Sequence, residues 1–232
     1  MSITIKDIKV VALDFDGVIT VAGENAKQDG WKVLFGELKK EGFREDIAEV
    51  YKRNEEYFTG KDGKGMIKGN RYDMLWVTFR EFGISGEETC DLVKRIARRY
   101  DEVTRELIVK SGVYDETLIA LNKWAISKLP LYIVSATPTE AVSESVTALN
   151  LGVRFKNIFG FPPRKPETLK KILSEEGIKS NELLFIGDSD GDRMSAEEVS
   201  CKFVGVETAW NGWSTASCSF PSVSRLTEIV LE

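Results

Sequence analysis

Short runs of apolar residues recur along the chain and are separated by stretches with helical periodicity. The runs lie at residues 10–13, 131–134, 183–186 and 203–206, with a weaker one at 157–159. Unbroken apolar runs of this length are typical of parallel strands that are buried on both faces. Between most of them, apolar residues repeat at helical spacing, as at Leu118, Leu121 and Ala125. This order of strands and helices predicts an α/β fold with a doubly wound parallel sheet.

The alternation is interrupted between the first two runs, where residues 21–109 show helical patterns and no convincing strand. Four amphipathic faces occur there, at residues 31–38, 47–58, 72–79 and 92–107. We therefore expect residues 21–109 to form an inserted helical bundle, with residues 1–20 and 110–232 as the core. The insert begins just after the first buried strand, so it can close over the end of that strand as a lid.

The chain has no histidine among its 232 residues. Proton transfer and covalent catalysis must then use carboxylates, lysine, serine or a metal ion. A net charge of -5 argues against general attraction to nucleic acid or to an anionic membrane and favours a small-molecule partner. Three widely spaced cysteines and the lack of a signal-like or membrane-spanning stretch predict a cytoplasmic protein.

Polar residues follow the predicted strands at the edge where a parallel sheet binds its ligands. Asp14 and Asp16 come directly after the first run and are followed by Gly17. Residues two apart in a strand point the same way, but a glycine at the strand end loosens the chain. The two carboxylates can therefore take different roles around one reacting centre.

Candidate anion-binding residues occur in the core and in the insert. Ser135 ends the second run, and its hydroxyl, with backbone N–H groups of a turn that includes Ala136, can hold a phosphate. The alternative for Ser135 is an ordinary helix N-cap. Arg71 stands at the expected start of a helix, where its guanidinium can make bidentate contact with an anion. The glycine- and lysine-rich run at 59–71 is expected to be a solvated loop, although its lysines could reach an anionic substrate.

Two further groups complete the candidate chemistry. Lys165 stands in a proline-rich loop that leads into a helix, where it can neutralise a phosphoryl group. Asp188 and Asp192 lie in an acidic loop after the third run, which lacks the glycine placement and the glutamate of a calcium-binding EF-hand. A hard, oxygen-ligated Mg²⁺ shared with Asp14 and Asp16 fits this loop better.

Together these groups resemble the haloacid dehalogenase superfamily. Its four motifs occur in this order: a D-x-D-G strand end, a Ser or Thr strand end, a Lys, and a G-D-x-x-x-D acidic loop. The resemblance implies a Rossmann-like core in which the insert between the first two motifs is an α-helical cap subdomain of the C1 type. The metal ligands that it implies are Asp14, the backbone carbonyl of Asp16, and Asp188, with Asp192 holding the metal's waters or Lys165.

The resemblance also implies roles for the other site residues. Asp14 would be the nucleophile that forms an aspartyl-phosphate, and Asp16 the general acid that later activates water. Lys165 would stabilise the phosphorylated intermediate, and Ser135 would bind the phosphate. Phosphoryl transfer places charge on the equatorial oxygens, so a carboxylate nucleophile needs a metal ion and a lysine to offset repulsion.

The expected function is that of a Mg²⁺-dependent phosphatase acting on a small phosphorylated metabolite, as a monomer or a homodimer. A sugar-phosphate phosphomutase stays open, because it uses the same intermediate. Dehalogenases typically lack the second acid of the first motif, here Asp16, and are disfavoured together with phosphonatases. Intact Asp14 and Lys165 disfavour a non-enzymatic binding module. Sugar phosphate, phosphoglycolate, nucleotide and phosphonate relatives share the same core, so the motifs leave the substrate open.

Overall fold

The computed structural model describes residues 2–21, 23–59, 71–84, 86–214 and 216–232. The chain forms two compact units. We call residues 1–25 and 108–232 the core unit, and residues 26–107 the helical unit. In the described residues, no helix has both the length and the apolar character that crossing a membrane requires.

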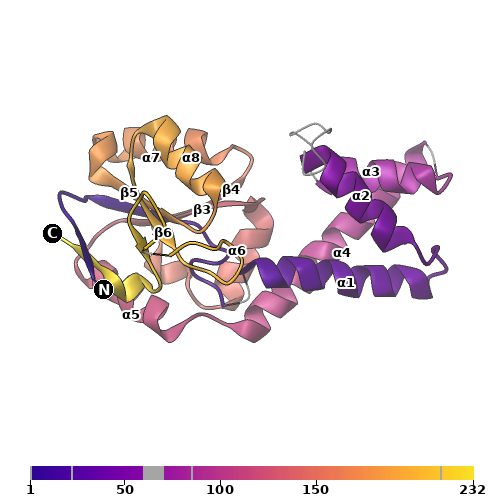
Figure 1. The fold of residues 1–232 in the computed structure, drawn as a ribbon, viewed down its shortest axis with the longest axis horizontal. Coiled ribbons are helices and arrows are strands. Elements are labelled where there is room, and N and C mark those ends of the chain that lie inside the picture. Colours follow the sequence, from indigo (N-terminus) through magenta and orange to yellow (C-terminus); the bar gives the residue numbers. More distant parts are fainter. Residues whose placement is uncertain (1, 22, 60–70, 85, 215) are drawn as a thin grey trace. The chain divides into compact units, whose positions relative to one another are not determined.

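The core unit contains a parallel sheet with the strand order β4-β3-β2-β5-β6-β7 (Figure 1). Its strands are β2 (Val10–Leu13), β3 (Leu131–Pro138), β4 (Asn157–Phe161), β5 (Leu183–Gly187), β6 (Lys202–Val206) and β7 (Ser222–Val223). β2 is buried throughout and pairs with β3 on one side and with β5 on the other. The strand order reverses at β2, so the polar residues that follow it lie at the position where doubly wound sheets bind ligands.

Helices cover both faces of this sheet, which confirms the predicted α/β class. They are α5 (Asp115–Ile126), α6 (Thr139–Ala148), α7 (Lys165–Glu176) and α8 (Asp190–Val199), with 3₁₀ turns at Gly152–Arg154, Ser180–Glu182 and Leu226–Glu228. Figure 1 shows α7 and α8 on one side of the sheet and α5 on the other. Leu169 and Ile172 of α7 pack with Tyr132 and Phe185 of the sheet in one buried cluster. Burial of these side chains fixes α7 against the strands whose ends carry the polar residues.

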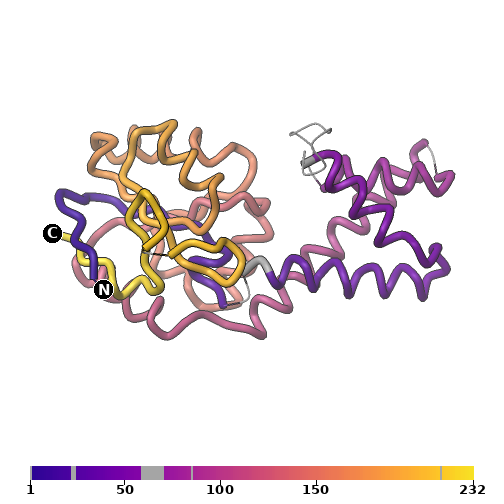
Figure 2. The backbone as a smooth tube through the Cα atoms, viewed as in Figure 1, coloured from indigo at the N-terminus to yellow at the C-terminus, as the bar shows by residue number. Residues whose placement is uncertain are grey.

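The sequence pattern missed three short strands. β1 (Ile3–Ile5) pairs in parallel with β8 (Ile229–Leu231), and β7 extends the main sheet by two residues. Figure 2 shows the two terminal segments running side by side. Strands of two or three residues are too short for a period to be recognised.

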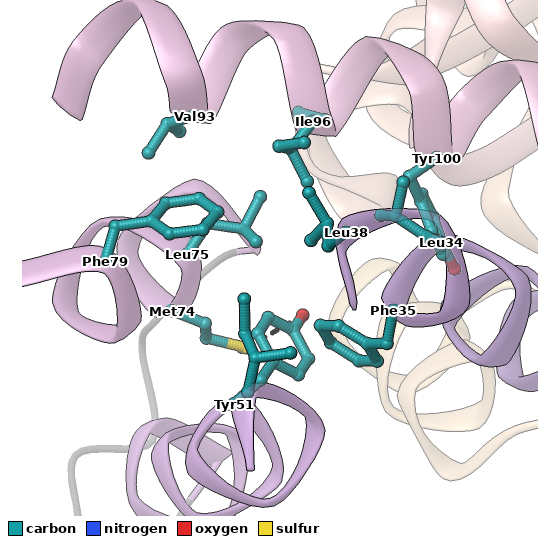
Figure 3. Packing of buried hydrophobic residues seen from close by; sticks show 12 residues of the cluster. Leu34, Phe35, Leu38, Tyr51, Met74, Leu75, Phe79, Val93, Ile96 and Tyr100 are labelled. Atoms are coloured by element: carbon teal, nitrogen blue, oxygen red, sulfur yellow. Dashed lines mark hydrogen bonds between the residues drawn. The ribbon is translucent and has the colours of Figure 1, made fainter. Parts of the chain in front are cut away.

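In its described residues, the helical unit contains four helices, whose apolar faces meet in one core. They are α1 (Gly23–Lys40), α2 (Ile47–Thr59), α3 (Arg71–Glu81) and α4 (Glu87–Ser111). The unit boundaries fall within α1 and α4, so residues 23–25 and 108–111 belong to the core unit. Figure 3 shows Leu38, Leu75 and Ile96 converging from three of these helices. The ring centroids of Trp31 and Tyr100 are 4.2 Å apart. Most aromatic positions of the sequence pattern therefore line the core of this unit, whereas Tyr72 and Trp76 are exposed. Most of the glycine- and lysine-rich run lies outside the described residues.

Candidate active site

Three buried aspartates meet at the carboxyl edge of the sheet. Asp14 follows β2, and its backbone N–H donates to the carbonyl of Ile186 in β5 over 2.8 Å. Asp188 follows β5, and Asp192 lies in the first turn of α8. Each of the three aspartates offers a carboxylate oxygen, and these atoms lie within 4.8 Å of one another. The fold thus brings together acidic residues from opposite ends of the core sequence.

Lys165 supplies a positive charge to this acidic group. Its Nζ lies 3.0 Å from Oδ1 of Asp14 and 2.5 Å from Oδ1 of Asp192. Burial by itself would lower the pKa of Lys165, but the two carboxylates outweigh burial and raise the pKa above its usual value. The ammonium therefore stays charged inside the site.

The local structure around Lys165 differs from the expected loop, because α7 begins at Lys165 itself. Pro166 favours this early start, since its fixed φ suits the first turn of a helix and its missing N–H needs no partner there. The side chain of Lys165 is consequently held by a helix that packs on the sheet, rather than by a loop.

Asp192 is held on both carboxylate oxygens. Lys165 contacts Oδ1, while the hydroxyl of Ser189 donates to Oδ2 over 2.5 Å. The same hydroxyl accepts the backbone N–H of Asp192 at 3.2 Å, so Ser189 is also the N-cap of α8. The structure thus places Asp192 beside Lys165, one of the two roles that the family resemblance implies for it.

Gly17 allows Asp188 to approach the end of β2. Its φ is +79°, a conformation that other residues rarely adopt. A Cβ atom at this position would lie only 2.2 Å from Oδ2 of Asp188. Glycine is therefore required both for the backbone conformation and for the position of the Asp188 carboxylate.

The segment after Val134 is extended, in contrast to the expected turn. β3 continues to Pro138, with an irregularity in its pairing with β4 between Val134 and Pro138. Ser135 is buried, and its Oγ accepts the backbone N–H of Thr137 at 3.1 Å. Ala136 is exposed and lines a cavity of about 670 Å³ together with Ser135 and Lys165. The two predicted phosphate-binding residues thus share one cavity with the lysine.

Arg71 belongs to the helical unit, where it is the first residue of α3. Its guanidinium forms a bidentate ion pair with Asp101, with N–O distances of 2.6 and 3.1 Å. The structure therefore gives Arg71 a partner within its own unit, and its expected contact with substrate stays a prediction.

Besides Ser189, three residues that contact the site aspartates were not among the predicted site residues. Thr137 donates its hydroxyl to Oδ2 of Asp16 at 3.2 Å. The indole Nε1 of Trp210 donates to Oδ2 of Asp188 at 2.9 Å, and the Asn211 amide donates to the carbonyl of Asp188 at 2.9 Å. Both Trp210 and Asn211 follow β6, the neighbour of β5. The sequence feature that could have identified Trp210 and Asn211 is their position just after a predicted buried strand.

Comparison with known proteins places this arrangement in a family. Residues 8–199 match the family model of the haloacid dehalogenase-like hydrolases. Phosphoglycolate phosphatase from Pectobacterium atrosepticum is 27% identical over 143 residues, which cover 59% of this chain and 61% of that protein. Phosphoglycolate phosphatase from Vibrio parahaemolyticus is 23% identical over an alignment of 249 positions, gaps included, which covers 98% of each chain.

Solved structures share the fold at low sequence identity. A protein described as a predicted phosphoglycolate phosphatase from Haemophilus somnus has a TM-score of 0.67 and 17% identity, with 96% of each chain covered. CbbY from Rhodobacter sphaeroides in complex with phosphate has a TM-score of 0.67 and 13% identity, with 95% of this chain and 96% of that chain covered. Since the family model spans most of the sequence, including Asp14, Ser135, Lys165 and Asp188, this chain belongs to the haloacid dehalogenase-like hydrolase family.

Proposed function

We propose that the protein is a Mg²⁺-dependent phosphatase that hydrolyses a small phosphate monoester through an aspartyl-phosphate on Asp14. The observation that supports this most strongly is the ammonium of Lys165, 3.0 Å from a buried Asp14 carboxylate inside an acidic group. A carboxylate attacks a negatively charged phosphate only where cations offset the repulsion. The relatives named phosphoglycolate phosphatase are consistent with hydrolysis of a monoester.

The donor set fits Mg²⁺, because the clustered ligands are carboxylate oxygens on buried residues. Asp14 and Asp188 would hold the ion with the backbone carbonyl of Asp16, and Asp192, already bonded to Lys165, would hold its waters. When bound, Mg²⁺ neutralises charge on the phosphate oxygens.

The protein's own residues then account for both halves of the reaction. The Asp14 carboxylate attacks phosphorus as the bond to the leaving oxygen breaks, and Asp16 gives its proton to that oxygen. Asp16 next takes a proton from water, whose oxygen attacks phosphorus and releases inorganic phosphate from Asp14. The hydroxyl of Thr137, 3.2 Å from Oδ2 of Asp16, restrains the orientation of this acid and base. Ser135 would bind the phosphate, and Lys165 would stabilise the phosphorylated intermediate.

The helical unit, in this proposal, is the cap that selects the substrate. A closing cap admits small phosphorylated metabolites and excludes bulk water from the acyl phosphate. Arg71 is the proposed substrate contact within this unit. Because its guanidinium already binds Asp101, an Arg71→Ala variant would need its stability measured alongside its substrate preference.

The first prediction concerns the metal requirement. Phosphate release from a panel of small phosphorylated metabolites should disappear on chelation and return with Mg²⁺, whereas Ca²⁺ should support it poorly. Asp188→Ala should raise the Mg²⁺ concentration that is needed, or abolish turnover. Full activity after exhaustive chelation would contradict the proposal. Interconversion of sugar-phosphate isomers without net phosphate release would instead identify a phosphomutase.

Substitution of Gly17 distinguishes the effect of backbone strain on turnover from the effect of displacing the proposed metal ligand Asp188. Gly17→Ala should reduce Mg²⁺-dependent turnover by about tenfold or more, because the new methyl group must push Asp188 aside. Gly112→Ala is the matched control, since Gly112 has a φ of +75° but its Cβ would have no neighbour within 4 Å. Both variants should lose stability by about 1 kcal/mol from the strained φ alone. Equal activity in the two variants would refute the steric role of Gly17.

A further inference from the structure

The loop that follows β6 contacts Asp188 at two points. Nε1 of Trp210 donates to the Oδ2 atom of its carboxylate at 2.9 Å, and Nδ2 of Asn211 donates to its main-chain carbonyl at 2.9 Å. One bond restrains the side chain and the other restrains the backbone of the same residue. Both partners lie outside the four sequence motifs.

Asn211 also organises the loop that presents Trp210. Its Nδ2 donates to the carbonyl of Val206 at 2.8 Å, and its Oδ1 accepts the backbone N–H groups of Thr208 at 3.2 Å and Trp213 at 3.0 Å. With the bond to Asp188, its amide makes four hydrogen bonds, which matches the full capacity of that group. The indole therefore stands on a loop whose conformation is fixed.

The indole of Trp210 also borders the end of β2. A Cβ atom built on Gly17 would lie 2.9 Å from Cζ2 of Trp210 and 2.2 Å from Oδ2 of Asp188. The ring and the carboxylate thus lie close together against the glycine, so steric contact and the hydrogen bond both restrict the movement of Asp188.

We infer that Trp210 and Asn211 are positioning residues that orient Asp188 for the cation and set the affinity of the site for Mg²⁺; this inference rests on the proposed function. A carboxylate can rotate about its terminal bond, and a donor on one oxygen selects one orientation. The indole N–H can select this orientation as a neutral donor, so it does not offset the negative charge that attracts the metal. A lysine or arginine in that place would compete with the cation. Such outer partners of a metal ligand typically change affinity by about 10- to 100-fold.

Calorimetric titration with Mg²⁺ tests the inference on the full chain. Trp210→Phe retains an aromatic ring, smaller than the indole, but removes the N–H donor, and should raise the dissociation constant by about tenfold or more. Asn211→Ala should act in the same direction, because it frees the backbone of Asp188. Trp213→Phe is the matched control from the same loop, since Trp213 packs on Phe220 with a centroid distance of 4.9 Å, and should leave the affinity unchanged.

Two further readouts distinguish positioning from a general structural role. Mg²⁺ should alter the tryptophan emission of the wild type and of Trp213→Phe, but not that of Trp210→Phe. At saturating Mg²⁺, phosphate release by Trp210→Phe should return to near the wild-type rate, while the Mg²⁺ concentration for half-maximal activity rises by the same factor as the dissociation constant. Circular dichroism verifies that each variant is folded.

Different results would overturn the positioning role of Trp210 and Asn211 and the proposed phosphatase function. Wild-type affinity for Mg²⁺ in folded Trp210→Phe and Asn211→Ala would overturn the inference and leave the phosphatase proposal intact. A wild-type protein that releases phosphate and binds no Mg²⁺ would overturn the proposed metal dependence and the inference together. Weakened binding in both variants, with Trp213→Phe unaffected, supports the inference.

Discussion

Asp14→Asn is expected to reduce turnover by about a thousandfold or more, which corresponds to about 4 kcal/mol of activation free energy. The substitution is nearly isosteric, but an amide oxygen is a far weaker nucleophile than a carboxylate. Asp14 is buried at the end of β2 and contacts Lys165, and the amide leaves no carboxylate at that position. Steady-state phosphate release at saturating Mg²⁺ measures the loss.

Asp190→Asn is the control for this experiment. Asp190 lies in the same acidic segment, but its side chain is 74% exposed and pairs with Arg193. Its variant should keep the wild-type rate, and circular dichroism should show both variants folded. Activity of Asp14→Asn within tenfold of the wild type would refute its role as the nucleophile.

Lys165→Met should cause the largest loss of stability among the site variants. The change leaves the carboxylates of Asp14 and Asp192 buried without their shared cation. Removing one partner of a buried ion pair typically costs about 3–5 kcal/mol. In a protein of this size, that loss corresponds to a fall in Tm of about 10 °C. Thermal unfolding in the presence of a chelator measures the effect without a contribution from metal binding.

Lys170→Met provides the matched comparison, because Lys170 is on the same helix and its ion pair with Glu198 is about half exposed. Exposed pairs contribute little to stability, so its Tm should stay close to that of the wild type. If Lys165→Met unfolded at the same temperature as Lys170→Met, the buried group of charges would not stabilise the core.

The sequence predicted the part of the site that depends on regular structure. The run Val10–Leu13 is buried throughout, as its apolar composition indicated, and it lies between β3 and β5. Parallel pairing places the ends of these strands at one edge, which is why Asp14 and Asp188 could be grouped before their distance was known. Periodicity also predicted the four helices of the helical unit, since each buries one apolar face.

The sequence could not predict contacts that depend on irregular backbone. Trp210 reaches Asp188 only because the loop after β6 takes a particular conformation, and no period in the sequence encodes that conformation. Residues 135–138 resemble the opening of a helix, but they continue β3, which pairs with β4 at Val134 and again at Pro138. In the irregular segment between these two pairs, the hydroxyl of Thr137 donates to Asp16. In both places tertiary contacts decide the local structure.

Trapping the phosphorylated enzyme tests the role of Asp14 most directly. Asp16→Asn should accumulate the intermediate from nitrophenyl phosphate, because nitrophenolate leaves without a proton whereas hydrolysis of the acyl phosphate needs a base. After acid quenching, peptide mass spectrometry should find one phosphoryl group on Asp14 and none in the double variant Asp14→Asn, Asp16→Asn. Release of nitrophenol by Asp16→Asn with no phosphoryl group on Asp14 at any time point would contradict the proposed mechanism.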